Sequence, residues 1–112
     1  MFIPDITVEE LAQKLSQPDL QLQLVDVREP WECEVVSLPN FINLPLSEFE
    51  QWSPTIQQKL DPNVETLVLC HHGVRSAQMC YWLMQNGFLR VQNIAGGIHA
   101  YSVRIDPSLN KY

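Results

Sequence analysis

An unbroken run of strand-forming residues, Thr66-Leu67-Val68-Leu69, constrains the fold of this chain more than any other feature. A strand without polar alternation must be covered on both faces, as in parallel sheets flanked by helices. Further strand patterns at 22–26, 41–44 and 91–94 alternate with helical patterns. This alternation predicts an α/β domain with a mainly parallel sheet and helices on both faces.

Local sequence also marks the expected helix boundaries. Thr7 and Glu10 form a capping box, so a helix is expected to begin there and to end by Pro18. A longer helix is expected over 76–86, because apolar residues recur at helical spacing and a glycine follows. A short helix is expected after the double glycine, through Tyr101.

Length and charge bound the class of protein. The 112 residues indicate one domain over 1–105, followed by a loose tail over 106–112. No apolar run approaches the roughly 20 residues of a membrane span, and the first residues lack the features of a secretory signal. The net charge of −6 argues against nucleic acid or a membrane as partner. Three widely spaced cysteines form a poor disulfide framework and favour a reducing, cytoplasmic location.

The segment that follows the run at 66–69 is the one that indicates chemistry. It connects the strand to the expected helix, and ligands bind beyond the carboxyl ends of parallel strands. Loop amides and the start of a helix favour negative charge, which stabilises a thiolate. Cys70 is therefore the predicted nucleophile, with a buried structural cysteine as the alternative. The predicted substrate-binding residues are those that follow it: His71, His72, Gly73, Val74, Arg75 and Ser76.

Three segments in this order resemble the rhodanese family: 25–32, 70–76 and 93–101. The resemblance implies a rhodanese-like fold with a five-stranded parallel sheet. It also implies transfer of sulfane sulfur through a persulfide on Cys70. The implied donor is a small sulfur-containing anion such as thiosulfate, and the acceptor is cyanide or a thiol, including a protein thiol. No cofactor is expected.

The chain departs from the family pattern at two places. A Gly-His-Ile-Pro-Gly-Ala segment is frequent before the second strand, whereas this chain reads Val-Ser-Leu-Pro-Asn-Phe at 36–41. The aromatic residue after the double glycine is commonly tryptophan and here is Tyr101. Neither difference touches the cysteine loop, so they bear on the surface that meets the acceptor.

Asp26 and Arg28 follow the first long strand, and we expect them to support the cysteine loop from a neighbouring strand end. The alternative is a loop-capping aspartate beside a solvated arginine. Metal binding by Cys70 with His71 and His72 is not expected, because adjacent side chains in a tight loop rarely converge on one ion.

The remaining cysteines and tryptophans are assigned to structure. Cys80 lies on the helix face that we assign to the core, and Cys33 has no evident charged partner. The tryptophans are expected in the core or a groove; they are Trp31, Trp52 and Trp82.

Two other functions remain open at this point. One is a non-catalytic binding or redox-sensing module of the same fold, although such a module would be expected to lack Cys70 or Gly73. The other is a cysteine phosphatase or arsenate reductase. Only four residues separate Cys70 from Arg75, one fewer than is usual in cysteine phosphatases. A shorter loop suits a single sulfur atom better than a tetrahedral oxyanion.

Overall fold

The computed structural model describes residues 2–112 and contains one parallel sheet of five strands. The strand order is β1-β5-β4-β2-β3, so β4 is central. The strands are β1 (Asp5–Ile6), β2 (Gln23–Asp26), β3 (Ile42–Asn43), β4 (Thr66–Leu69) and β5 (Val91–Ile94). The run at 66–69 is fully buried, as its lack of polar alternation predicts.

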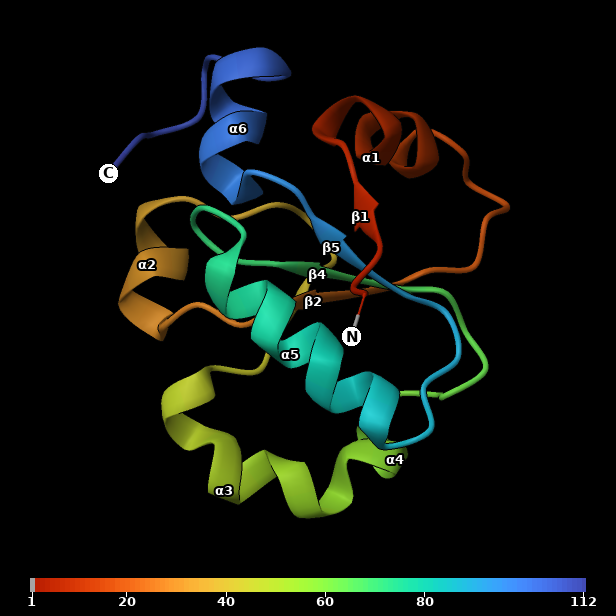
Figure 1. Cartoon of the computed structure of the whole chain (residues 1–112). Coiled ribbons are helices and arrows are strands. Elements are labelled where there is room, and N and C mark those ends of the chain that lie inside the picture. Colours follow the sequence, from red (N-terminus) through yellow and green to blue (C-terminus); the bar gives the residue numbers. More distant parts are fainter. Residues whose placement is uncertain (1) are drawn as a thin grey trace.

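Helices cover both faces of the sheet (Figure 1). One layer holds α1 (Val8–Leu15) and α6 (Gly97–Arg104), which contact each other. The other holds α3 (Phe49–Trp52), α4 (Ile56–Lys59) and α5 (Val74–Gln85), with short 3-10 turns at Leu46–Glu48 and Ser53–Thr55. The short α2 (Pro30–Val35) lies near the start of α5. None of the helices in the described part of the chain is long and apolar enough to cross a membrane.

Side chains alternate between the two layers along β4. Leu67 and Leu69 pack into the core beneath α1 and α6, whereas Val68 and Cys70 pack into the core beneath α3, α4 and α5. This alternation follows from the two-residue period of a strand. The alternation places Cys70, the predicted nucleophile, on the face of the sheet that α5 covers.

Most predicted elements are present, and two differ. The capping box of Thr7 and Glu10 is formed at the start of α1. The helix predicted to begin at Ser76 begins at Val74, because Gly73 adopts a left-handed φ of 98° and acts as the N-cap. The strand β1 was not predicted, since two residues show no periodicity.

The prediction of a loose tail over 106–112 is wrong. Leu109 and Tyr112 pack against the core of the α1 and α6 layer, and the Asn110 side-chain amide donates to the Val35 carbonyl at 3.0 Å. The tail is mostly polar in composition. Nothing in its sequence therefore indicates that the Tyr112 side chain contacts Arg28 and Glu32, which lie far away in the chain.

Candidate active site

Cys70 lies at the carboxyl end of the central strand and is 1% exposed. Its Sγ accepts a hydrogen bond from the Gly73 amide at 3.0 Å and lies 3.2 Å from the Ser76 hydroxyl. The loop is therefore folded around the sulfur.

The N-terminus of α6 fixes the backbone of this loop. Ile98 and His99 donate their amides to the carbonyls of Cys70 and His71, at 2.9 and 3.0 Å. A Cβ on Gly97 would lie 2.5 Å from both carbonyl oxygens, so only glycine permits this approach. In a trans peptide the N–H points opposite to the C=O. The N–H groups of these two peptide units therefore point away from α6, and their orientation is set before any substrate binds.

A chain of polar side chains lies behind the sulfur. Ser76 is fully buried and donates its hydroxyl proton to the Asn93 side-chain oxygen. The Asn93 amide group donates to the Gly73 carbonyl at 3.1 Å and to the Asp5 carboxylate at 3.3 Å. With the Ser76 proton committed to Asn93, the neutral Cys70 thiol is the donor in the contact between sulfur and hydroxyl. On ionisation, that hydroxyl can turn toward the thiolate.

Asp26 is the last residue of β2, the strand beside β4, and Arg28 follows two residues later. Asp26 pairs in register with Leu69, and β2 neighbours β4. Arg28 is fully buried; its Nε and Nη2 bind the Asp26 carboxylate, with the shortest contact at 2.8 Å. Its Nη1 donates to the Tyr112 hydroxyl at 3.0 Å. The alternative of a solvated arginine is wrong. The guanidinium is directed at α2 and the chain end, not into the cysteine loop.

Arg75 pairs with the buried carboxylate of Glu32, whereas the alternative considered from the sequence was an outward-pointing arginine paired with a surface acid. Its Nη1 and Nη2 bind the two carboxylate oxygens of Glu32 at 2.6 and 2.9 Å. The Tyr112 hydroxyl donates to the same carboxylate at 2.8 Å. The hydrogen bonds from Arg75 are the main reason that the pKa of Glu32 is lowered to about 2. The Arg75 side chain is 34% exposed, so it can still meet an anion from solvent.

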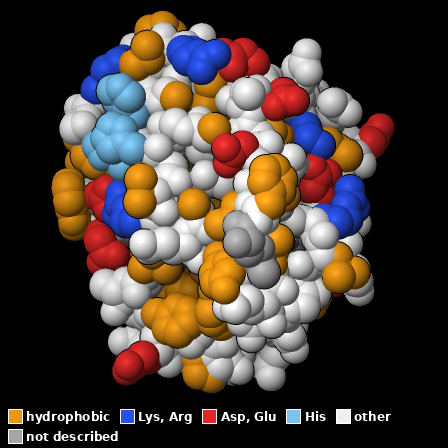
Figure 2. All heavy atoms as spheres, in the orientation of Figure 1, with side chains coloured by type: hydrophobic (Ala, Val, Ile, Leu, Met, Phe, Trp, Pro, Cys, Tyr) orange, Lys and Arg blue, Asp and Glu red, His pale blue; other side chains and the backbone are white. Residues whose placement is uncertain are grey.

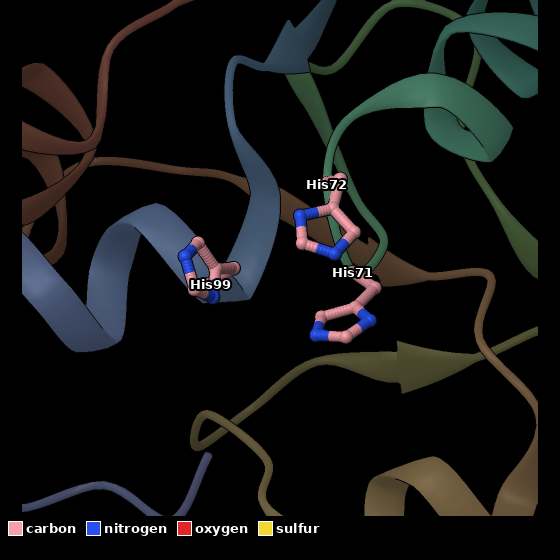
Figure 3. A group of neighbouring side chains, drawn as sticks. All are labelled: His71, His72 and His99. Carbon is pink, nitrogen blue, oxygen red and sulfur yellow. The ribbon is translucent and has the colours of Figure 1, made fainter. Parts of the chain in front are cut away.

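The histidines gather beside the loop (Figure 3). His71 stacks on the Tyr112 ring, with centroids 3.9 Å apart and an interplanar angle of 8°. Burial, followed by the charge of His72, lowers the pKa of His71. His99 reaches the same place from α6, and one of its ring nitrogens lies within 4.8 Å of one ring nitrogen of each of the other two. No local pattern could have found His99, because it comes from a different segment.

The predicted loop residues have distinct environments. Gly73 and Ser76 contact the sulfur, and His71 and His72 line the side that faces α6. Val74 is 68% exposed, so the group it can offer the site is its backbone.

The two other cysteines are held as neutral thiols. Burial is the main cause that raises the pKa of Cys33 to about 11 and that of Cys80 to about 12. Trp52 is buried and Trp82 half-buried, as expected. Trp31 is 60% exposed and therefore does not lie in the core, the first of the two expected places; it packs edge-on against the Tyr112 ring.

A cysteine at the end of a central parallel strand, enclosed by a short loop that begins a helix, defines an α/β domain with a cysteine loop at the carboxyl edge of its sheet. The profile of the Rhodanese-like domain family matches residues 7–104. The chain therefore belongs to the rhodanese-like family, and the predicted fold class and family are confirmed.

Relatives with known names and structures agree with this membership. The chain is 49% identical to Rhodanese-like/PpiC domain-containing protein 12, chloroplastic, of Arabidopsis thaliana, covering 98% of this chain but 38% of that protein. It is 32% identical to a protein named Sulfurtransferase from Allochromatium vinosum, covering 89% of each. The structure of a rhodanese-like domain protein from Staphylococcus aureus superposes with a TM-score of 0.78 at 30% identity, covering 98% of this chain and 99% of that one. The family membership and these names support sulfur transfer in general.

Proposed function

We propose that this protein is a sulfurtransferase that carries sulfane sulfur as a persulfide on Cys70. The observation that carries the proposal is the position of Sγ. It lies at the end of the central strand, with the Gly73 amide at 3.0 Å and the Ser76 hydroxyl at 3.2 Å. A relative named Sulfurtransferase matches most of the length of this chain.

The reaction balances in two steps without a cofactor. The Cys70 thiolate attacks the outer sulfur of thiosulfate, the S–S bond of thiosulfate breaks, and sulfite leaves with its electron pair. The product is a persulfide anion on Cys70. A nucleophile such as cyanide then attacks the terminal sulfur, which releases thiocyanate and restores the thiolate. Each step moves one sulfur atom, and neither needs an external oxidant or reductant.

The surroundings of the sulfur suit an anion at each stage. The peptide units held by α6 present fixed N–H groups, so little reorganisation is needed when charge moves onto the terminal sulfur. Ser76 can donate to whichever sulfur carries the charge. Arg75 offers the guanidinium that we assign to the incoming dianion, with Glu32 holding it in place.

We propose a small sulfur-containing anion as donor and cyanide or a thiol, including a protein thiol, as acceptor. The burial of Cys70 favours donors small enough to enter the loop. We place the protein in a reducing compartment such as the cytoplasm, because all three cysteines are free.

Intact-mass spectrometry after thiosulfate treatment tests the proposal. The wild-type protein is expected to gain the mass of one sulfur atom and to lose it on treatment with a reducing thiol or cyanide. Cys70→Ser should gain nothing and should lack thiosulfate:cyanide transfer. Cys33→Ser and Cys80→Ser serve as matched controls and should keep most of the activity, because both thiols are protonated at neutral pH. Substantial transfer by Cys70→Ser would refute the mechanism.

A further inference from the structure

We propose that His71, His72 and His99 form a binding site for a divalent transition-metal ion of the Zn²⁺ type at the mouth of the cysteine loop. The chain contains three histidines, and all of them meet here from two separate segments. A metal held by Cys70 with His71 and His72 is not expected from the sequence. In the structure, His99 on α6 supplies a third imidazole instead, while Cys70 stays buried under the loop.

The spacing of the imidazoles suits one ion. Their ligand nitrogens lie within 4.8 Å of one another. Zn–N bonds of about 2.0–2.1 Å in a tetrahedral site place ligand nitrogens about 3.4 Å apart, so the rings must close by little more than about 1 Å. The side chains of His72 and His99 are exposed and can turn through this distance without disturbing the core.

The scaffold of the cluster is already fixed. The amide of His99 donates to the carbonyl of His71 at 3.0 Å, which ties α6 to the loop. The ring of His71 is held by its stack on Tyr112. These contacts use main-chain groups and ring faces, and they leave the imidazole nitrogens available as ligands. Figure 3 shows the three rings close together between the loop and α6.

The donor set selects the class of ion. Neutral imidazole is a good ligand for Zn²⁺, Cu²⁺, Ni²⁺ and Co²⁺ and a poor one for Mg²⁺ or Ca²⁺. Three histidines with an open fourth position make a site that a water molecule or an anion can complete. The net charge of −6 favours a cation, and the charge of Arg75 is offset by Glu32. Figure 2 shows the histidines reaching the surface together, so an ion has access from solvent.

One of the proposed ligands, His71, directly follows Cys70 in the chain, so a bound metal ion would lie close to the cysteine loop. We expect it to obstruct the approach of donor and acceptor, so that bound Zn²⁺ inhibits sulfur transfer. This consequence for activity rests on the proposed function, whereas binding of the metal does not. The two are therefore measured separately.

Titration of tag-free protein with Zn²⁺ by calorimetry tests the site directly. We expect one equivalent to bind, and Co²⁺ to give ligand-field absorption bands without a sulfur-to-metal charge-transfer band. His99→Gln should weaken Zn²⁺ binding at least about tenfold, since loss even of groups that only orient ligands costs about 10–100-fold. Val103→Gln, an exposed position on the same helix, is the matched control and should bind as the wild type does. Cys70→Ser should also retain binding.

Activity provides the second readout. Zn²⁺ should inhibit transfer by the wild type, EDTA should reverse this, and His99→Gln should lose a smaller fraction of its own metal-free activity at the same Zn²⁺ concentration. The proposal is overturned if tag-free protein binds no Zn²⁺, or if His99→Gln binds as the wild type does. It is also overturned if Cys70→Ser abolishes binding, because the ion would then sit on the thiol. Absence of sulfur transfer in the wild type would refute the proposed function and leave the binding result standing.

Discussion

Single residues set the charge balance of the cysteine loop. Arg75 is one half of an ion pair whose acid, Glu32, is buried on α2 and also accepts from Tyr112. The position of Cys70 at the start of a tight loop could be predicted, because its strand, its glycine and its helix are adjacent in the chain. Glu32 and Tyr112 could not be predicted, because nothing in their local sequence shows which distant side chain they meet.

The first prediction concerns the charge of Arg75. Arg75→Ala should lower kcat/KM for thiosulfate by about tenfold or more, because a charge-assisted hydrogen bond to an anion contributes about 1.5–3 kcal/mol. The measurement is a steady-state cyanide assay at varied thiosulfate. Glu32→Gln is the matched variant: it removes the carboxylate that positions Arg75 but keeps the guanidinium, so it should lower kcat/KM for thiosulfate less than Arg75→Ala does. An unchanged kcat/KM in Arg75→Ala would show that Arg75 serves the fold alone.

At the scale of elements, the loop is shaped by a helix outside it. The start of α6 binds two loop carbonyls, and Gly97 permits the close approach. The strand β4, the loop and α5 follow one another in the chain, so their arrangement could be predicted from sequence. The contact of α6 with the loop could not be worked out from local pattern, because it depends on the pairing of β5 with β4, which lie far apart in the chain.

The second prediction compares two glycines that both have positive φ. Gly97→Ala brings a Cβ to 2.5 Å from two carbonyl oxygens, whereas Gly87→Ala meets nothing within 4 Å. Gly87→Ala should therefore lower the free energy of unfolding only by the cost of a left-handed backbone at alanine, about 1–2 kcal/mol. Gly97→Ala should cost clearly more, and it should also reduce sulfur transfer because the loop must move.

Chemical denaturation and the cyanide assay measure both effects. The Gly87→Ala protein is expected to keep full activity, since its position lies at the far end of α5. Equal stability losses in the two variants, with activity intact in both, would show that α6 does not determine the geometry of the loop.

At the scale of the whole molecule, the parallel sheet brings distant chemistry to one edge. Because β4 is central and its neighbours run the same way, Asp26 at the end of β2 and Cys70 just after β4 lie at the same edge of the sheet. The alternation of strands and helices was enough to predict this layered fold. The edge strand β1 and the docked residues 106–112 depend on contacts between the chain ends and the body, which the pattern does not show.

The third prediction concerns global stability against pH. The folded-state pKa of Glu32 is lowered to about 2 from 4.5, mainly by hydrogen bonds from Arg75. A lowered folded pKa means that the stabilisation is fully present above pH 4.5 and is lost as the pH falls toward 2. The contribution is at most about 3 kcal/mol.

Thermal unfolding between pH 2 and pH 7, compared for the wild type and Glu32→Gln, measures this contribution. The difference in stability between the two proteins should be constant near neutral pH and should shrink as the solution is acidified. A difference that does not change with pH would mean that the carboxylate of Glu32 has the same proton affinity in the folded and unfolded chains.

The gathering of every imidazole of the chain at one place has a practical consequence. Histidine ring protons give resolved signals in one-dimensional NMR spectra, and in most proteins these signals are scattered over unrelated positions. Here all of them originate beside Cys70. These few signals can be followed without isotopic labelling while a sulfur donor, an acceptor or a metal ion is added. Any change in them would report on the cysteine loop, because the chain has no histidine elsewhere.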